Sequence, residues 1–470
     1  MAPLLSTGAP RLTEPPGRWL FNDPVAGLWL RPWFDRAALH ALTRWYMPLS
    51  RAWAAALAAG EDAERFWREL PGAAAAWPGP GVALRLVARR RRLYEDAAAA
   101  WERALFGDDG ASSEARVAAE TQRRGAAERL MLSRGAFVPL ALQGRLPPVK
   151  WEVRGPQEVA ARHGPRVAAP EARFPPPDWP EIARSQALPG PAGEQFWLRF
   201  PSPLPETGGE AWARVFAPAG VAHPPTIIFL HGICVELEFW PDSRDPLPTL
   251  AGRGIRVVRP EGPWHGRRRL EGSFGGEPAL ARGPMGFIEL FEAWVTEIAV
   301  LIAWARDTSD GPVALGGISL GALTSQLVAT AARHWPERMR PDALLLVATS
   351  GEMAETLSQS SMGRAIGLPQ ELAKRGWRSE DMATWRALVE PEGAPAPAPE
   401  HIVMVLGSVD DVTPYPGGLG LSEAWQVPAV NRFIWPRGHF STGLGIGADQ
   451  GPLRRLLEIL EGLRGGPGVT

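Results

Sequence analysis

A serine between small residues is the first pattern in this sequence that could carry nucleophilic chemistry. Residues 317–321 are GISLG, and they follow a short apolar run at 313–315 and precede a helical run at 322–333. A strand, a sharp turn and a helix hold a serine hydroxyl above a sheet, because small flanking residues let strand and helix approach closely. A serine that only caps a helix is also common. The assignment of Ser319 as a nucleophile therefore depends on finding a base and an acid elsewhere in the chain.

The base has few candidates. A serine nucleophile needs a histidine that a third group orients, and after a turn of this kind the chain order is serine, acid, histidine. Three of the eight histidines follow Ser319. His334 lies at the far end of the helical run and His401 begins an apolar run, so both are expected away from the carboxyl ends of the strands. His439 follows the last apolar run, in WPRGHF, and we predict it to be the base.

The acid is expected after the preceding apolar run, at 402–406. The turn that follows it, GSVDDVTP at 407–414, contains two adjacent aspartates. We predict Asp410 to be the acid that orients the histidine, with Asp411 as the alternative and Glu352, after an earlier run, as a third candidate.

A tetrahedral intermediate also needs two backbone N–H groups aimed at its oxyanion. Leu320, directly after the serine, is expected to supply one of them. The second is expected from the loop after the apolar run at 226–230, where HGIC stands at 231–234. We predict Ile233 as that donor, His231 as a structural residue and Cys234 as a small packed hydrophobic residue.

These residues need a parallel sheet to bring them together. Short, almost wholly apolar runs alternate with helical patterns, as a sheet covered on both faces requires. The helical stripe between the second and third runs contains Phe287, Leu290, Phe291, Trp294, Ile298, Leu301 and Trp304. Residues 195–200 and 211–217 alternate like antiparallel edge strands. We therefore predict an α/β fold with a mostly parallel, doubly wound sheet and chemistry at the carboxyl ends of its strands. The six runs are 226–230, 255–259, 313–315, 343–348, 402–406 and 432–435.

The first part of the chain has a different character. Residues 1–145 are predicted to form an N-terminal helical region, with a helix capped by Asp35, interrupted at Pro48 and ending at Gly60. Further helices are predicted at 82–106 and 113–133, and the arginines at 89–92 are expected on a solvated helix face. Residues 146–193 are Pro-rich and predicted to be an extended connection. Residues 194–470 are the predicted α/β domain, with a lid insertion at about 351–400. Because the N-terminal helices are rich in Trp and Leu, we expect them to cover this domain.

Composition excludes several classes of protein. The chain has 50 Lys and Arg against 51 Asp and Glu, so it lacks the basic surplus of a nucleic-acid binder. Cys234 is the only cysteine, which excludes an intramolecular disulfide and a multi-cysteine metal site. No signal-peptide pattern and no apolar run of 18 residues occurs, so we expect no transmembrane segment and a cytoplasmic location. The predicted chemistry uses side chains and water, and we expect no metal and no organic cofactor.

The HG loop, the GxSxG turn, the GxxDxxxP turn and the terminal GH together resemble the α/β-hydrolase superfamily of serine hydrolases, over residues 195–465. The resemblance implies the α/β-hydrolase fold and cleavage of a carboxylic ester or thioester through an acyl-enzyme, on a small-molecule ester or lipid-like substrate. Polyester synthases share the layout but carry Cys where this chain has Ser319. The alternatives are an acyltransferase with the same catalytic residues, or a catalytically silent scaffold whose Trp-rich N-terminal helices bind a partner or a membrane surface.

A further segment is expected at the rim of the site. The sequence PEGPWHGRRR, at 260–269, follows the run at 255–259. Its arginines are interpreted either as a solvated loop or as a clamp for a carboxylate or phosphate on the substrate. If the clamp is absent, the pocket is expected to be an apolar acyl site. The predicted substrate-binding residues are Trp240, Trp264, His265, Arg267 and Arg268.

Overall fold

The structure of the chain is a computed structural model. It describes residues 30–464 except 72, 74–76, 78, 108–109, 145, 239–244 and 246.

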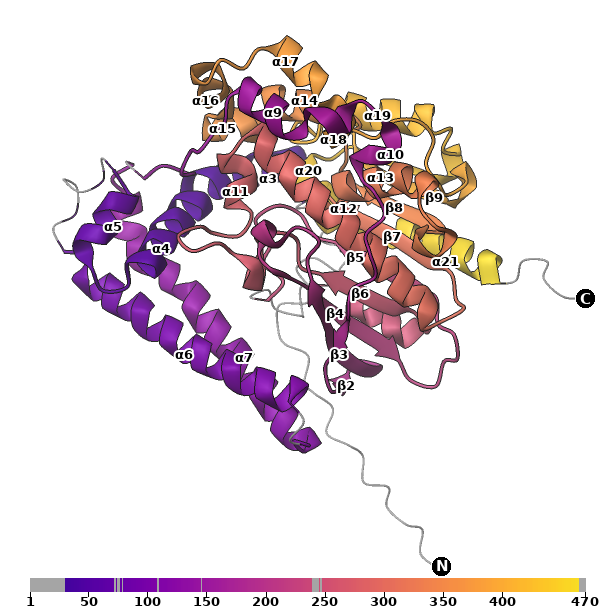
Figure 1. The fold of residues 1–470 in the computed structure, drawn as a ribbon, viewed down its shortest axis with the longest axis horizontal. Coiled ribbons are helices and arrows are strands. Elements are labelled where there is room, and N and C mark those ends of the chain that lie inside the picture. The colour runs from indigo at the N-terminus through magenta and orange to yellow at the C-terminus, as the bar shows by residue number, and fades with distance from the viewer. Residues whose placement is uncertain are drawn as a thin grey trace, which may run out of the picture.

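A mixed sheet forms the centre of the molecule (Figure 1). Its strands follow the order β1-β3-β4-β6-β5-β7-β8-β9-β10, with β2 paired to β3. The strands from β6 to β10 are parallel, and β3 and β4 form the antiparallel edge that the alternating pattern predicted. The α/β fold prediction is therefore confirmed. The strands are β1 Ala183–Arg184, β2 Leu188–Gly190, β3 Gly193–Pro201, β4 Glu210–Pro218, β5 Thr226–Leu230, β6 Arg256–Pro260, β7 Val313–Ile318, β8 Ala343–Val347, β9 Ile402–Gly407 and β10 Arg432–Trp435.

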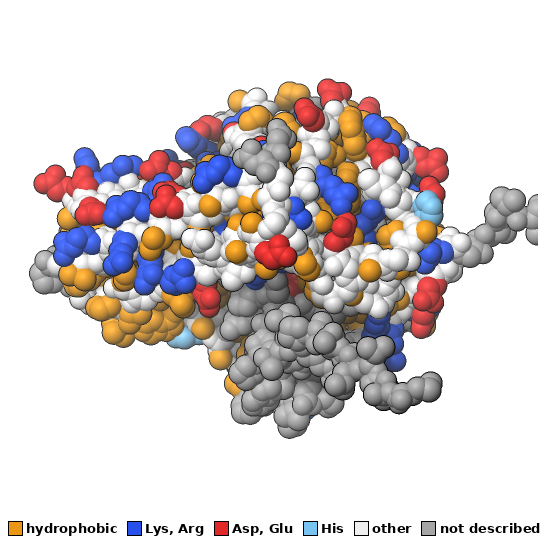
Figure 2. Space-filling view, turned by 90° about the horizontal axis from the view of Figure 1, so that it is seen from below, with side chains coloured by type: hydrophobic (Ala, Val, Ile, Leu, Met, Phe, Trp, Pro, Cys, Tyr) orange, Lys and Arg blue, Asp and Glu red, His pale blue; other side chains and the backbone are white. Residues whose placement is uncertain are grey.

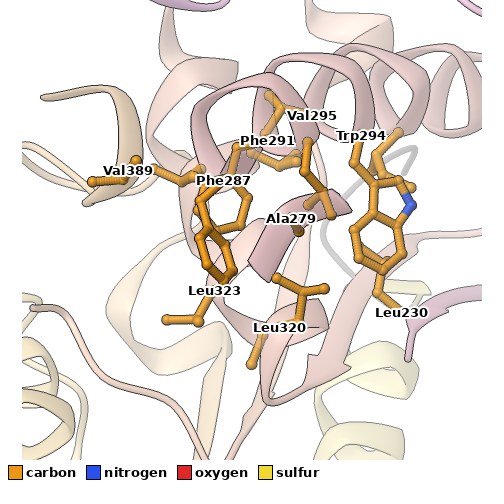
Figure 3. Packing of buried hydrophobic residues seen from close by; sticks show 14 of the residues in the cluster. Leu230, Ala279, Phe287, Phe291, Trp294, Val295, Leu320, Leu323 and Val389 are labelled. Atoms are coloured by element: carbon orange, nitrogen blue, oxygen red, sulfur yellow. The ribbon is translucent and has the colours of Figure 1, made fainter. Parts of the chain in front are cut away.

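Helices cover both faces of the sheet. On one face α12 (Pro284–Asp307) packs across α13 (Leu320–Ala331), and α21 (Gly451–Arg464) lies on the other face. Figure 3 shows the first contact from close by, with Phe287 and Trp294 of α12 directed toward the α13 and β5 side chains. The predicted stripe of α12 is buried throughout. Further helices of this part are α11 Glu277–Ala281, α19 Tyr415–Ala424 and α20 His439–Ala448.

The segment between β8 and β9 forms a group of short helices above the carboxyl ends of the strands. This is the region predicted as an insertion at about 351–400. Its helices are α14 Met353–Gln359, α15 Ser361–Ile366, α16 Leu368–Lys374, α17 Ser379–Thr384 and α18 Arg386–Val389.

The N-terminal region is helical, as predicted, and the end of its helix α6 (Gly81–Phe106) packs against the antiparallel strands β2, β3 and β4 (Figure 1). Figure 2 shows this flank from another side, with basic and acidic side chains interspersed. Within the run at 89–92, Arg91 pairs with Glu95 and Arg92 with Glu61, both on the exposed surface. The helices are α3 Pro32–Ala41, α4 Met47–Ala59, α5 Ala63–Glu69, α6 Gly81–Phe106, α7 Ser113–Leu132 and α8 Val138–Ala141.

Three details of the prediction for this region are wrong. The first helix begins at Pro32 and not at Asp35, which lies in its first turn. Pro48 does not interrupt the helix. A π-helical turn at 42–46 joins α3 to α4, and the chain stays helical through the proline, which is the second residue of α4. The Pro-rich connection is not wholly extended. It contains α9 (Pro156–Val167) and α10 (Pro170–Arg173), and each begins with a proline at its first position.

Buried ion pairs join the N-terminal helices to the loops of the α/β part. Arg51 of α4 lies 2.9 Å from Glu277, and the two side chains are 1% and 2% exposed. Arg123 of α7 pairs with Glu238, which also accepts a hydrogen bond of 2.7 Å from the Tyr94 hydroxyl. Because an unpaired carboxylate in such a place is costly, Glu277 depends on Arg51, and Glu238 shares its charge between Arg123 and Arg267 of the α/β part.

Aromatic contacts strengthen the same junction. The Trp101 ring of α6 meets Trp197 of β3 edge-on, with 5.2 Å between centroids, and lies 6.2 Å from Trp212 of β4. Within the described residues, no helix combines the length and hydrophobicity needed to cross a membrane.

We predict that Arg51→Met lowers the free energy of unfolding by about 3–5 kcal/mol, because it leaves Glu277 buried without a counter-charge. The matched control is Arg65→Met, which removes an exposed pair with Glu271 in the same part of the junction and should cost at most about 1 kcal/mol. Urea unfolding of both variants measures the difference. Equal losses would show that the buried pair carries no special share of the stability.

Candidate active site

Ser319 lies at the turn between β7 and α13. Its φ is 55° and its ψ −120°, a conformation that L residues rarely adopt, and it presents the side chain beyond the end of the strand. The two flanking glycines are required because neighbouring backbone lies too close to leave room for a side chain. A Cβ at Gly317 would lie 2.3 Å from the Gly321 carbonyl carbon, and one at Gly321 would lie 2.5 Å from the Leu230 oxygen.

His439 reaches this serine from the edge of the parallel sheet, where β10 ends. It begins α20 after β10, and its Nε2 lies 2.9 Å from the Ser319 Oγ. Its Nδ1 lies 2.8 Å from Oδ2 of Asp410. The three side chains therefore form a continuous line from hydroxyl to imidazole to carboxylate, which is the geometry in which a histidine can take a proton from a serine.

The turn after β9 fixes Asp410. Oδ1 accepts hydrogen bonds from the N–H groups of Val412 and Thr413, at 2.9 and 3.0 Å. The Thr413 hydroxyl lies 3.0 Å from Oδ2 and 3.1 Å from His439 Nδ1. Thr413 is a residue that the sequence analysis missed. Its position three residues after the aspartate, in a turn that an aspartate side chain can close, is the signal that could have indicated it.

Asp411 points elsewhere. Its Oδ1 accepts a hydrogen bond of 2.8 Å from the Ser361 hydroxyl, and its carbonyl accepts another of 2.8 Å from the Ser361 N–H. It therefore holds the start of α15 against the acid turn. Of the two adjacent aspartates, the structure brings Asp410 to the histidine.

The environment of His439 favours its protonated form. Burial alone would lower the pKa of the imidazole, but the charge of Asp410 and its hydrogen bond outweigh burial, and the pKa is raised above its usual value. An imidazolium that forms during a reaction would therefore be stabilised at this position.

The two predicted oxyanion donors lie beside the serine. Leu320 occupies the first position of α13, where a backbone N–H has no partner within the helix. Ile233 lines the same cavity as Ser319 and Leu320. The HG turn lies directly against the serine, because a Cβ at Gly232 would be 3.6 Å from the Ser319 Cβ.

His231 fixes that turn. Its Nε2 accepts a hydrogen bond of 2.9 Å from the Gly262 N–H, and its Nδ1 lies 2.8 Å from the Gly232 oxygen. Burial lowers the pKa of this imidazole well below its usual value, so the ring is neutral and donates through Nδ1. Cys234, also buried, has its pKa raised to about 12 by burial and packs as a thiol.

An apolar cavity opens at Ser319. The helices between β8 and β9 form one wall of it, and residues of α11, α12, α13, the HG turn and the turn after β9 form the rest. Its polar side chains are Ser319, Thr356, Ser360 and Thr413. Its apolar lining consists of Ile233, Leu280, Phe287, Leu320, Leu323, Met353, Leu357, Met362, Ile366, Leu368 and Val412.

The predicted anion clamp is wrong, because both arginines already have carboxylate partners. Arg268 makes two hydrogen bonds to Glu297, of 2.8 and 2.6 Å, and is 1% exposed. Arg267 lies 2.5 Å from Glu261 and 3.3 Å from Glu238. Neither lines the cavity at Ser319. The loop turns inward, and its arginines neutralise buried carboxylates: Arg267 pairs with Glu261 of the same loop and with Glu238, and Arg268 pairs with the distant Glu297, which the local sequence does not reveal.

Two of the other predicted substrate-binding residues, Trp264 and His265, also lie outside the cavity. Trp264 is fully buried, and its ring N–H points to the Glu206 carbonyl. His265 is buried against the His231 ring, and burial lowers its pKa to about 4. Trp240 lies outside the described residues. In the part of the chain that the structure describes, no cluster of three or more His, Cys, Asp or Glu is placed to hold a metal ion.

Comparison with known proteins agrees with this architecture. Residues 227–458 match the model of the Alpha/beta hydrolase family, and the match spans the strands that carry Ser319, Asp410 and His439. The chain carries an alpha/beta hydrolase domain. Among curated proteins, none matches the chain.

Solved structures similar to the hydrolase domain are distant. Acetyl xylan esterase 1 from Thermoanaerobacterium sp. JW/SL YS485 is 16% identical, with a TM-score of 0.43 over 66% of this chain and 96% of that one. The Pyrococcus horikoshii acylaminoacyl peptidase is 12% identical, with a TM-score of 0.39 over 61% of this chain and 48% of the peptidase. This chain thus spans about half of the peptidase's length. A cold-adapted esterase from an Arctic intertidal metagenomic library is 13% identical, with a TM-score of 0.38 over 59% and 97% of the two chains. At these identities the neighbours say nothing of the substrate of this hydrolase domain.

We predict that Asp410→Asn lowers the turnover of a nitrophenyl ester by about 10³ to 10⁴, because an amide at this position holds the imidazole in the wrong tautomer. Asp411→Asn is the matched control and should cost far less, since its side chain contacts Ser361. Steady-state kinetics of the two variants measures the difference. The reverse ranking would transfer the role of the acid to Asp411.

Proposed function

We propose that the hydrolase domain cleaves carboxylic esters or thioesters through an acyl-enzyme at Ser319. The observation that carries this proposal is the line of two hydrogen bonds, of 2.9 and 2.8 Å, that joins Ser319, His439 and Asp410 beside an apolar cavity that Ser319 lines.

In the first half of the reaction the Ser319 oxygen attacks the carbonyl carbon of the substrate. His439 Nε2 takes the hydroxyl proton as the bond to carbon forms, and Asp410 stabilises the resulting imidazolium. The N–H groups of Ile233 and Leu320 donate to the oxyanion. When the intermediate collapses, the bond from carbon to the leaving oxygen or sulfur breaks, and His439 protonates the leaving group.

The second half repeats these steps with water. His439 takes a proton from a water molecule as the water oxygen attacks the acyl carbon, and it returns the proton to Ser319 as the acyl–serine bond breaks. The products are a carboxylic acid and the free serine. The proposed chemistry is complete with these side chains and water.

The cavity favours an apolar acyl group. Apart from the serine, the polar atoms in its lining are the hydroxyls of Thr356, Ser360 and Thr413, and the rest of the lining is aliphatic, aromatic or thioether. Each buried methylene of an acyl chain contributes about 0.8 kcal/mol to binding. With Arg267 and Arg268 paired to carboxylates, we propose that the substrate is a small-molecule ester whose acyl part is uncharged.

We predict that a fluorophosphonate probe labels the protein and that Ser319→Ala abolishes the labelling. The physical reason is that only a serine with a bound imidazole is activated enough to displace fluoride. Ser408→Ala, which changes an exposed serine beside the acid turn, is the control and should label as fast as the unchanged protein. In-gel fluorescence with peptide mapping is the measurement. Labelling that persists in Ser319→Ala would end the nucleophile assignment.

A further inference from the structure

A carboxylate from the N-terminal region reaches the loop that carries His439. Helix α3 lies beside α20, although the two are separated by about four hundred positions in the chain (Figure 1). The contact is made by Asp35, which was expected to cap its own helix. Arg31 stands at that N-cap position instead, and the Asp35 side chain is free to act elsewhere.

Asp35 binds the residues on both sides of the histidine. Its Oδ1 accepts a hydrogen bond of 2.8 Å from the Ser441 N–H. Its Oδ2 accepts one of 3.1 Å from the Gly438 N–H and one of 2.5 Å from the Ser441 hydroxyl. One side chain thus satisfies two of the backbone N–H groups that a helix leaves unpaired at its start, and His439 stands between them.

The glycine before the histidine fits this arrangement. Gly438 occupies the N-cap position of α20 with a φ of −88°, which any residue can adopt. A Cβ there would lie 2.5 Å from the Asp35 carboxyl carbon. A side chain at position 438 would therefore collide with Asp35. Gly438 has no side chain to cap α20, and Asp35 of α3 provides the cap instead.

We propose that Asp35 is a positioning residue for the reaction: by binding Gly438 and Ser441 it holds His439 at hydrogen-bonding distance from Ser319. This inference rests on the proposed serine hydrolase function. On this proposal the N-terminal helical region helps to position the active site. The 2.9 Å distance between Ser319 and His439, over which the proton moves, depends on the Asp35 side chain of α3.

The charge of Asp35 acts in the same direction. Burial lowers the pKa of His439, Asp410 raises it most, and Asp35 and then Asp411 raise it further. Arg437, two residues before the histidine, lies over the Trp435 ring. Removal of the Asp35 charge should therefore lower the pKa of His439. Since the neutral imidazole is the active form, the acidic limb of the kcat/KM profile should move to lower pH.

The test compares Asp35→Asn with Asp62→Asn. Asp62 caps α5 in the same region through the N–H groups of Glu64 and Arg65, so the control makes the same carboxylate-to-amide change at a helix start away from the site. For Asp35→Asn we expect a kcat about 10-fold lower, a KM within about twofold and an acidic limb displaced to lower pH. Asp62→Asn should keep the kcat and the pH profile of the unchanged protein.

Ser441→Ala gives an independent measurement should Asp35→Asn fail to fold. It removes the hydroxyl that contacts Asp35 but keeps the carboxylate, so kcat should fall while the acidic limb stays in place. The proposal is overturned if Asp35→Asn keeps a kcat within twofold of that of the unchanged protein. If only Ser441→Ala folds, the same result in that variant overturns it. So does an equal loss in Asp62→Asn.

His439→Ala separates this proposal from the proposed function. If His439→Ala keeps full esterase activity, the serine hydrolase proposal fails and the role of Asp35 fails with it. If His439→Ala is inactive and Asp35→Asn is fully active, the role of Asp35 alone is overturned.

Discussion

The hydrogen bond between the Ser319 hydroxyl and the His439 imidazole is the contact on which the rest of the site depends. Its two partners lie on different strand ends, and a proton can pass between them only while their separation stays near 2.9 Å. The serine is held by a strained turn between β7 and α13. The imidazole is held on one side by Asp410, which Thr413 supports, and its loop is held on the other side by Asp35. Three separate parts of the fold therefore converge on one bond.

A second constraint, the cost of burying charge, ties the N-terminal helices to the same loops. The loop after β5 and the start of helix α11 carry carboxylates, Glu238 and Glu277, that are almost wholly removed from solvent. Their counter-charges include Arg123 and Arg51 from α7 and α4. The ion pairs need not add net stability, but a buried carboxylate whose arginine is missing would strongly destabilise the folded protein. The helical region thus serves the hydrolase domain in two ways: it neutralises the loops, and through Asp35 it supports the histidine.

Most of the fold was predictable because its strands are short, continuous apolar runs, and such runs are local properties of the sequence. The ends of the predicted strands differ from those of the structure by at most three residues, at Ile318, whereas β1 and β2 were not predicted as strands. The GxSxG turn indicated Ser319, chain order then favoured His439 and the turn with Asp410 and Asp411, and the structure places Ser319, His439 and Asp410 together. Predictions about charged side chains failed where the partner is distant. Arg268 was interpreted as a solvated residue or a clamp, because nothing local indicates Glu297, and Asp35 was interpreted as a cap for its own helix for the same reason.

The most direct test of the account is to find the acyl group itself. The protein would be mixed with an excess of a nitrophenyl ester that has an apolar acyl chain, quenched in acid within milliseconds, digested and mapped by mass spectrometry. We expect the peptide containing Ser319 to gain the mass of the acyl group and the adduct to disappear as the ester is consumed. Hydrolysis of the ester with no adduct on that peptide, or with an adduct on another side chain, would contradict it.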